Sequence, residues 1–87
     1  MISVENQLNE RLQRLLPQSL QLIDDSARHA GHAGARGGKH FVVRIVASCF
    51  AGLTPLGRHR LIYDAAGDLM QGTIHALSIQ AFTPDEV

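Results

Sequence analysis

The segment FVVRIVAS, which begins at Phe41, constrains the fold of this 87-residue chain more than any other feature. It is rich in β-branched residues, and its alternate positions from Phe41 to Ala47 are apolar. This pattern predicts a strand between His40 and Cys49 with one buried face and Arg44 on the other face.

A helix is expected directly after this strand. Thr54-Pro55 is a strong helix start, because a capping hydroxyl is followed by proline at the first helical position. Gly67 is predicted to end the helix before a last turn through Leu69 and Met70, so that two short helices form rather than one long helix. The predicted buried side of the first of them comprises Leu56, Ile62, Tyr63 and Ala66.

The remaining elements follow from the same kinds of pattern. Leu77, Ile79 and Ala81 alternate with more polar positions and predict a third strand, after which Thr83-Pro84 starts a short terminal helix. Before the central strand, helical spacing of apolar residues predicts a helix over about residues 3–16. A short strand follows it and ends at Asp24-Asp25, and residues 26–39 form a glycine-containing loop.

The expected order is therefore α-β-β-α-α-β in a single domain spanning residues 1–87. The first two strands can pair antiparallel, whereas the helical connection between the second and third favours a right-handed parallel crossover. We expect an α/β fold with a three-stranded mixed sheet that the helices cover on one face.

Composition limits the class of protein. Hydrophobic residues make up 45% and charged residues 18% of the chain, which is typical of a folded domain. Cys49 is the sole cysteine, so neither an internal disulfide nor an all-cysteine zinc site can form. No apolar run is long enough for a spanning helix and no signal pattern opens the chain, so no membrane contact and a cytoplasmic location are expected.

Four histidines are expected to meet at one end of the sheet, because the glycine-containing loop and the starts of the second and third strands lie there. They are His29, His32, His40 and His75. Imidazoles that are close in space and distant in sequence are typical of a metal site. There are three alternatives. His75 could lie at the rim of the core, because it shares the parity of Leu77. His29 and His32 could be exposed to solvent, and His40 could brace the loop.

A basic block spans residues 26–63, which contain six Lys and Arg and no Asp or Glu. Within it, Arg58-His59-Arg60 lies in the first turns of a predicted helix and can contact phosphates, as can Arg44 and Lys39. Such a surface would attract nucleic acid or an acidic protein, and the alternative is a solvated basic patch.

No catalytic arrangement is evident, so we expect a protein that is not an enzyme. Ser26 and Ser48 have no base-and-acid pair in the pattern, and no glycine-rich phosphate loop leads into a helix. Cys49 is expected to be a partly covered structural cysteine rather than a reactive thiol.

A series of short motifs, in this order and spacing, resembles the BolA-like proteins from about residue 4 to the end. The motifs are Asp24-Asp25-Ser26, His29-Ala30-Gly31-His32, His40-Phe41, Phe50-x-Gly52, Arg58-His59-Arg60, Tyr63, Ile74-His75-Ala76-Leu77 and Thr83-Pro84-Asp85-Glu86. The resemblance implies a fold related to class II KH domains, in agreement with the element order above.

The resemblance also implies a partnership with monothiol glutaredoxins. The two proteins would share a 2Fe-2S cluster, to which the glutaredoxin and glutathione supply thiolates and this chain supplies histidine. His75 matches the C-terminal ligand of the family. The second ligand would come from the loop between the first two strands, with His29 favoured, His32 close behind and His40 third. Imidazole in place of thiolate would raise the cluster potential.

Some BolA-like proteins are described as transcription regulators that bind DNA, which here would use Arg58, Arg60 and the basic face. The chain has no net charge and would bind DNA weakly unless it dimerised. We expect a monomer or a weak homodimer.

Overall fold

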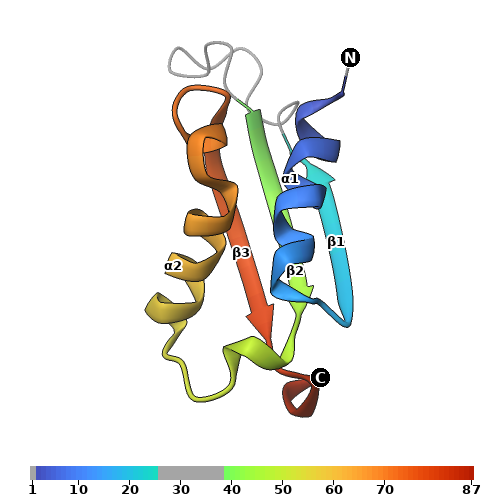
Figure 1. Ribbon diagram of the computed structural model, residues 1–87, viewed down its shortest axis with the longest axis vertical. Helices are drawn as coiled ribbons and strands as arrows, with labels where there is room; N and C mark the ends of the chain where they lie inside the picture. The colour runs from blue at the N-terminus through green and yellow to red at the C-terminus, as the bar shows by residue number, and fades with distance from the viewer. Residues whose placement is uncertain (1, 26–38) are drawn as a thin grey trace.

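The computed structural model describes residues 2–25 and 39–87, and these form two helices in front of a three-stranded sheet (Figure 1). The α-helices are α1 (Val4–Leu12) and α2 (Pro55–Ala66), and the strands are β1 (Ser19–Asp24), β2 (Lys39–Val46) and β3 (Ile74–Phe82). Short 3-10 turns lie at η1 (Gln13–Leu15), η3 (Ser48–Phe50), η4 (Gly67–Met70) and η5 (Pro84–Glu86). The predicted element order and the α/β class are confirmed.

The sheet has the order β1-β2-β3, with β1 antiparallel and β3 parallel to β2. Both pairings agree with the connection rules, because a loop connection allows an antiparallel neighbour and a helical crossover favours a parallel one. The starts of β2 and β3 therefore lie at the same end of the sheet as the end of β1 (Figure 1).

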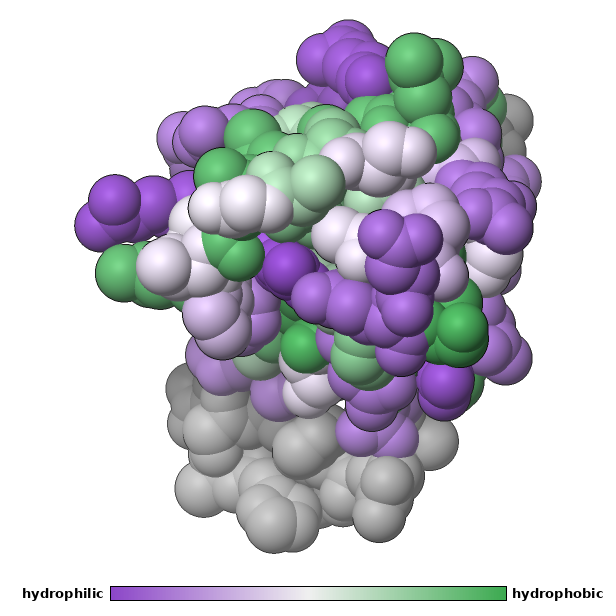
Figure 2. Space-filling view, turned by 90° about the horizontal axis from the view of Figure 1, so that it is seen from below, coloured by the Kyte–Doolittle hydropathy of each residue, from purple (hydrophilic) through white to green (hydrophobic). Residues whose placement is uncertain are grey.

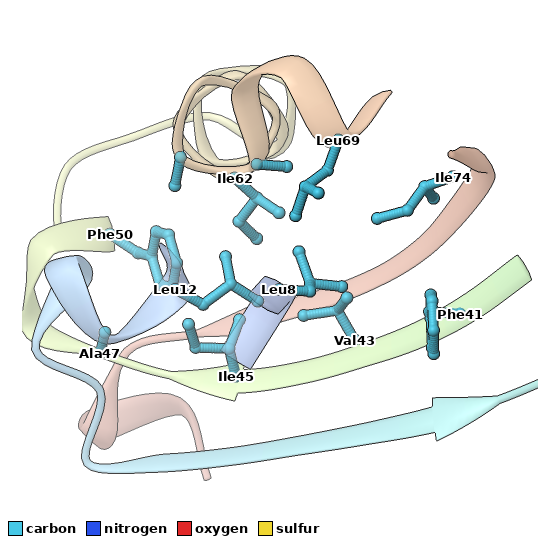
Figure 3. Packing of buried hydrophobic residues seen from close by; sticks show 12 residues of the cluster. Leu8, Leu12, Phe41, Val43, Ile45, Ala47, Phe50, Ile62, Leu69 and Ile74 are labelled. Carbon is cyan, nitrogen blue, oxygen red and sulfur yellow. The ribbon is translucent and has the colours of Figure 1, made fainter. Parts of the chain in front are cut away.

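The core lies between the helices and one face of the sheet (Figure 3). Phe41, Val43 and Ile45 on β2 are at most 2% exposed, as their alternation predicts. Leu8 and Leu12 on α1 and Ile62 on α2 cover them. Burial of such side chains stabilises the fold by about 1.5–3 kcal/mol each.

The start of α2 forms as predicted. Thr54 is the N-cap, its hydroxyl accepts a hydrogen bond from the Gly57 backbone N–H at 3.1 Å, and Pro55 opens the helix. The helix ends at Gly67, which has φ of +55°, and η4 follows as the predicted separate turn.

The predicted buried side of α2 is partly wrong. Ile62 and Ala66 are buried, but Leu56 is 59% exposed and Tyr63 is 39% exposed. Apolar residues lie almost all round this helix, so the pattern leaves its rotation open. Contact with α1 and the sheet selects the arc of Ile62, Ala65 and Ala66.

Candidate functional site: a histidine pair at the start of the sheet

A local irregularity in the pairing of β2 with β3 positions the candidate site. Lys39 pairs with Ile74, but the next residue, His40, pairs with Ala76. The register therefore shifts, and His75 is the extra residue on β3, without a Cα partner on β2. Such bulges re-aim a side chain and are common beside functional sites.

Two imidazoles lie together beside this shift. The ring centroids of His40 and His75 are 5.1 Å apart, and the ring planes are inclined by 34°. His75 is exposed and His40 is half-buried. The expectation that these two histidines meet at one end of the sheet is confirmed.

The alternative that placed His75 at the rim of the core is wrong. Strand parity groups His75 with Leu77, but the extra residue breaks the alternation at the start of β3, so Ile74 is buried and His75 faces solvent. Sequence patterns contain no clear signal for this shift, because it depends on the register that β3 adopts against β2.

The loop that carries His29 and His32 lies outside the described residues. An ion pair joins the end of β1 to the start of β2, on either side of this loop, because Lys39 Nζ lies 3.6 Å from Asp24 Oδ2. Lys39 is thus an ion-pair partner within the sheet as well as a neighbour of His40.

The potential metal-binding atoms at this end of the sheet are imidazole nitrogens. Within residues 2–25 and 39–87, no group of three or more His, Cys, Asp or Glu is arranged to hold a metal ion. Cys49 lies in η3, beyond the opposite end of β2. The described residues can therefore offer two imidazoles to a metal but would need further ligands from elsewhere.

Cys49 is exposed and is therefore less covered than expected. Partial desolvation raises the pKa of its thiol, which disfavours the reactive thiolate.

The five basic candidates do not gather on one surface of the structure. Arg44 lies in β2 on the sheet face opposite the helices, where its Cα partners are Gln21 and Gln80. Arg60 is exposed on α2 and His59 is half-buried there. Lys39 lies at the start of β2, beside the histidine pair.

Arg58 is half-buried and is bound by other parts of the chain. Its guanidinium Nη1 and Nη2 donate to the two carboxylate oxygens of Glu86 at 2.7 and 3.0 Å. It also donates to the carbonyl oxygens of Leu53 and Ala81 at 3.2 and 3.1 Å. These contacts leave Arg58 a structural role in the described molecule, and the sequence pattern did not identify Glu86 as its partner.

The fold and the histidine pair together define a small α/β domain that presents imidazoles at one sheet end, and the chain belongs to the BolA-like protein family. The family model described as "BolA-like protein" matches residues 12–86.

Individual relatives agree with this assignment. The chain is 43% identical over 82 residues to BolA-like protein 1 of Mus musculus, covering 93% of this chain and 58% of the relative. It is 45% identical over 87 residues to SufE-like protein 1, chloroplastic/mitochondrial, of Arabidopsis thaliana, covering 92% of this chain and 24% of that protein. The chain thus spans less than two thirds of the length of these relatives.

A solved structure and a bacterial relative extend the comparison. The BolA domain of SufE1 from Arabidopsis thaliana superposes with a TM-score of 0.88 at 43% identity, covering 100% of this chain and 99% of that chain. The DNA-binding transcriptional regulator BolA of Vibrio cholerae is 36% identical over 83 residues, covering 95% of this chain and 74% of the relative. These likenesses confirm the mixed α/β fold and the family, and the KH-like relationship stays a prediction.

Proposed function

We propose that this chain is an adaptor that binds a monothiol glutaredoxin and shares a 2Fe-2S cluster with it. The observation that carries the proposal is the exposed His75 at the register shift, whose ring centroid lies 5.1 Å from that of His40. His75 is the first ligand, and the second imidazole comes from His29, His32 or His40.

The donor set supports a shared cluster rather than one that this chain holds by itself. The described end of the sheet offers imidazole nitrogens, and the sole cysteine lies at the opposite end. Thiolates must then come from the partner and from glutathione. When bound, the cluster would supply one-electron chemistry at a potential raised by its nitrogen ligands.

The experiment is a titration of the chain with a cluster-loaded monothiol glutaredoxin, followed by visible absorption and circular dichroism. Complex formation is expected to change both spectra, and His75→Ala is expected to abolish the change. His59→Ala is the matched control, because it removes a histidine that lies on α2 near the other end of the sheet. An unchanged spectrum on mixing the natural chain would refute the proposal.

A ligand role and a structural role for His75 can be separated by His75→Cys. A ligand role predicts that the thiolate restores cluster sharing, with an altered visible spectrum and a lower reduction potential. A structural role predicts no such change in potential. Single His29→Ala, His32→Ala and His40→Ala variants identify the second ligand by the same spectra.

A second candidate function is DNA binding, which the likeness to the Vibrio cholerae regulator favours. Within α2, Arg60 and His59 are available to phosphates, because Arg58 is bound to Glu86. Affinity should fall steeply with salt and should weaken in Arg60→Ala. Unchanged affinity in that variant would exclude the α2 surface.

A further inference from the structure

The two edge strands of the sheet differ in how well they are protected from pairing with another chain. β1 has six residues, follows Pro17 closely, and ends in Asp24 with Asp25 next to it. β3 has nine residues and contains no Lys, Arg, Asp, Glu or Pro. Proteins usually protect an exposed edge with charges, proline or short length. β1 carries these features and β3 does not.

The outer edge of β3 presents backbone groups that can pair with a further strand. The Ala47 N–H donates to the Phe82 carbonyl at 2.9 Å, so Phe82 directs its backbone groups toward β2. Because successive residues of a strand alternate in this direction, Leu77, Ile79 and Ala81 direct theirs outward. The Ala81 carbonyl agrees with this, since it accepts from Arg58. Within the described residues β3 pairs with β2 alone, which leaves Leu77 and Ile79 without a strand partner.

A hollow of about 250 Å³ lies beside this edge, between β3 and the first half of α2. Its lining residues on the two elements are Pro55, Arg58, His59, Ile79, Gln80, Ala81 and Phe82. The exposed apolar residues Leu56 and Tyr63 lie on α2, the helix that forms one wall of the hollow. Figure 2 views the molecule from this end and shows hydrophobic surface beside hydrophilic side chains. We call this feature the α2–β3 groove.

Arg60 is the charge beside the groove that can attract an acidic side chain of an occupant. The Arg58 guanidinium in the lining is already neutralised by the Glu86 carboxylate. His59 is one of the lining residues, and Arg60 next to it is exposed without an ion pair to the described part of the chain. The nearest acidic residue further along α2 is Asp64.

We propose that the α2–β3 groove binds an extended acidic segment of a partner protein as a fourth strand of the sheet. Its backbone pairs with the outward groups of Leu77 and Ile79, one apolar side chain enters the hollow, and its carboxylates lie near His59 and Arg60. This is strand addition, in which main-chain hydrogen bonds supply affinity and a side-chain pocket supplies selectivity. A second copy of this chain suits the groove less well, because its own β3 has no acidic residue to offer.

The experiment uses the full chain labelled with ¹⁵N and titrated with the acetylated, amidated peptide Thr-Glu-Thr-Leu-Thr-Glu-Thr, in which the leucine and both glutamates lie on the same face of a strand. Strand addition predicts larger shifts for the amides of Leu77, Ile79 and Ala81 than for those of Ser78 and Gln80, which face β2. The same peptide methylated at alternate backbone nitrogens is the control and is expected not to bind, because it has lost the strand-pairing N–H groups.

A charge reversal tests the acidic character of the partner. Arg60→Glu is expected to weaken peptide binding about threefold to tenfold. Arg14→Glu, which makes the same change in the exposed turn after α1, is expected to leave it unaltered. Equal loss in both variants would show a general charge effect and would contradict the proposal.

Other outcomes would also overturn it. The absence of peptide-induced shifts along β3 would exclude strand addition at this edge. Shifts of these amides that depend on protein concentration without peptide would assign the groove to a second copy. Shifts caused by an eight-residue oligothymidylate but not by the peptide would assign it to nucleic acid. Because the titration requires no cluster and no glutaredoxin, its failure would leave the histidine-pair proposal untouched.

Discussion

At the scale of single residues, Arg58 shows how a partner distant in sequence changes the role of a side chain. Its guanidinium joins the start of α2, the end of β3 and the C-terminal turn η5 through Leu53, Ala81 and Glu86. Glu86 also accepts a hydrogen bond from the Thr83 N–H at 2.8 Å. The Arg58 hydrogen bonds and the Thr83 N–H lower the pKa of Glu86 from 4.5 to about 2.

This contact predicts a pH-dependent contribution to stability. A carboxyl whose pKa is lower in the folded state stabilises the fold above its unfolded-state value, and that contribution is lost as the pH falls toward the folded value. Glu86→Gln should therefore lower the melting temperature at pH 7, and the difference from the natural chain should shrink between about pH 4.5 and pH 2.

Thermal unfolding followed by circular dichroism across this range measures the effect. Asp85→Asn is the matched control, because Asp85 is exposed beside Glu86 and forms no ion pair with the described residues. A Glu86→Gln difference that stays constant from pH 7 to pH 2 would contradict the assignment of the contact.

At the scale of elements, α2 is defined by its two ends more than by its amphipathic pattern. Thr54 caps its start, and Gly67 ends it with a positive φ of 55°. At that end Arg11 from α1 donates to the Ala66 carbonyl at 2.7 Å and contacts Asp68 at 2.6 Å. The pKa of Asp68 is lowered by this guanidinium. The end of α2 is thus also the place where the two helices are joined.

Two glycine substitutions, one within α2 and one at its C-cap, should have opposite effects on the free energy of unfolding. Gly67→Ala places a Cβ at a positive φ and 3.2 Å from Arg11 Nη1, and is expected to cost about 1–2 kcal/mol. Gly57→Ala lies within the helix, with its nearest new contact at 3.4 Å to Thr54 Oγ1, and is expected to add about 0.5–1 kcal/mol.

Urea unfolding of both variants and the natural chain provides the measurement. The two changes add the same methyl group, one within α2 and one directly after it, so they differ in backbone conformation and in the space around the new atom. A loss of stability in Gly57→Ala, or none in Gly67→Ala, would contradict this account of how α2 ends.

At the scale of the whole molecule, parallel pairing of β2 and β3 separates two proposed binding sites. The histidine pair lies where the two strands start, and the α2–β3 groove lies toward the end of β3 (Figure 1). Among the described residues, no helix is both long and apolar enough to cross a membrane. The two sites share β3 but no residue.

The separation predicts that the sites act independently. His75→Ala should abolish the glutaredoxin-dependent spectral change and leave peptide affinity at the groove unaltered. Arg60→Glu should weaken peptide binding at the groove and leave the glutaredoxin-dependent spectral change unaltered. A double-mutant cycle in the peptide-binding assay tests this, and a coupling of more than about 0.5 kcal/mol would show that the sites communicate.

Local patterns were sufficient to predict the elements and the sheet. Alternation identified the buried face of β2, the Thr54-Pro55 start located α2, and the connection rules predicted both strand pairings. These features depend on neighbouring residues or on general chain geometry, so the sequence by itself determined them. The meeting of His40 with His75 was also predicted, because topology brings the starts of β2 and β3 together.

The tertiary structure decided three further features: the exposure of His75, the outward position of Leu56 and Tyr63, and the internal role of Arg58. The first depends on a shift in register between two strands, the second on the rotation of a helix with several apolar sides, and the third on a carboxylate 28 residues away. Each is chosen by competition among long-range contacts of the folded chain, which a pattern of neighbouring residues does not encode.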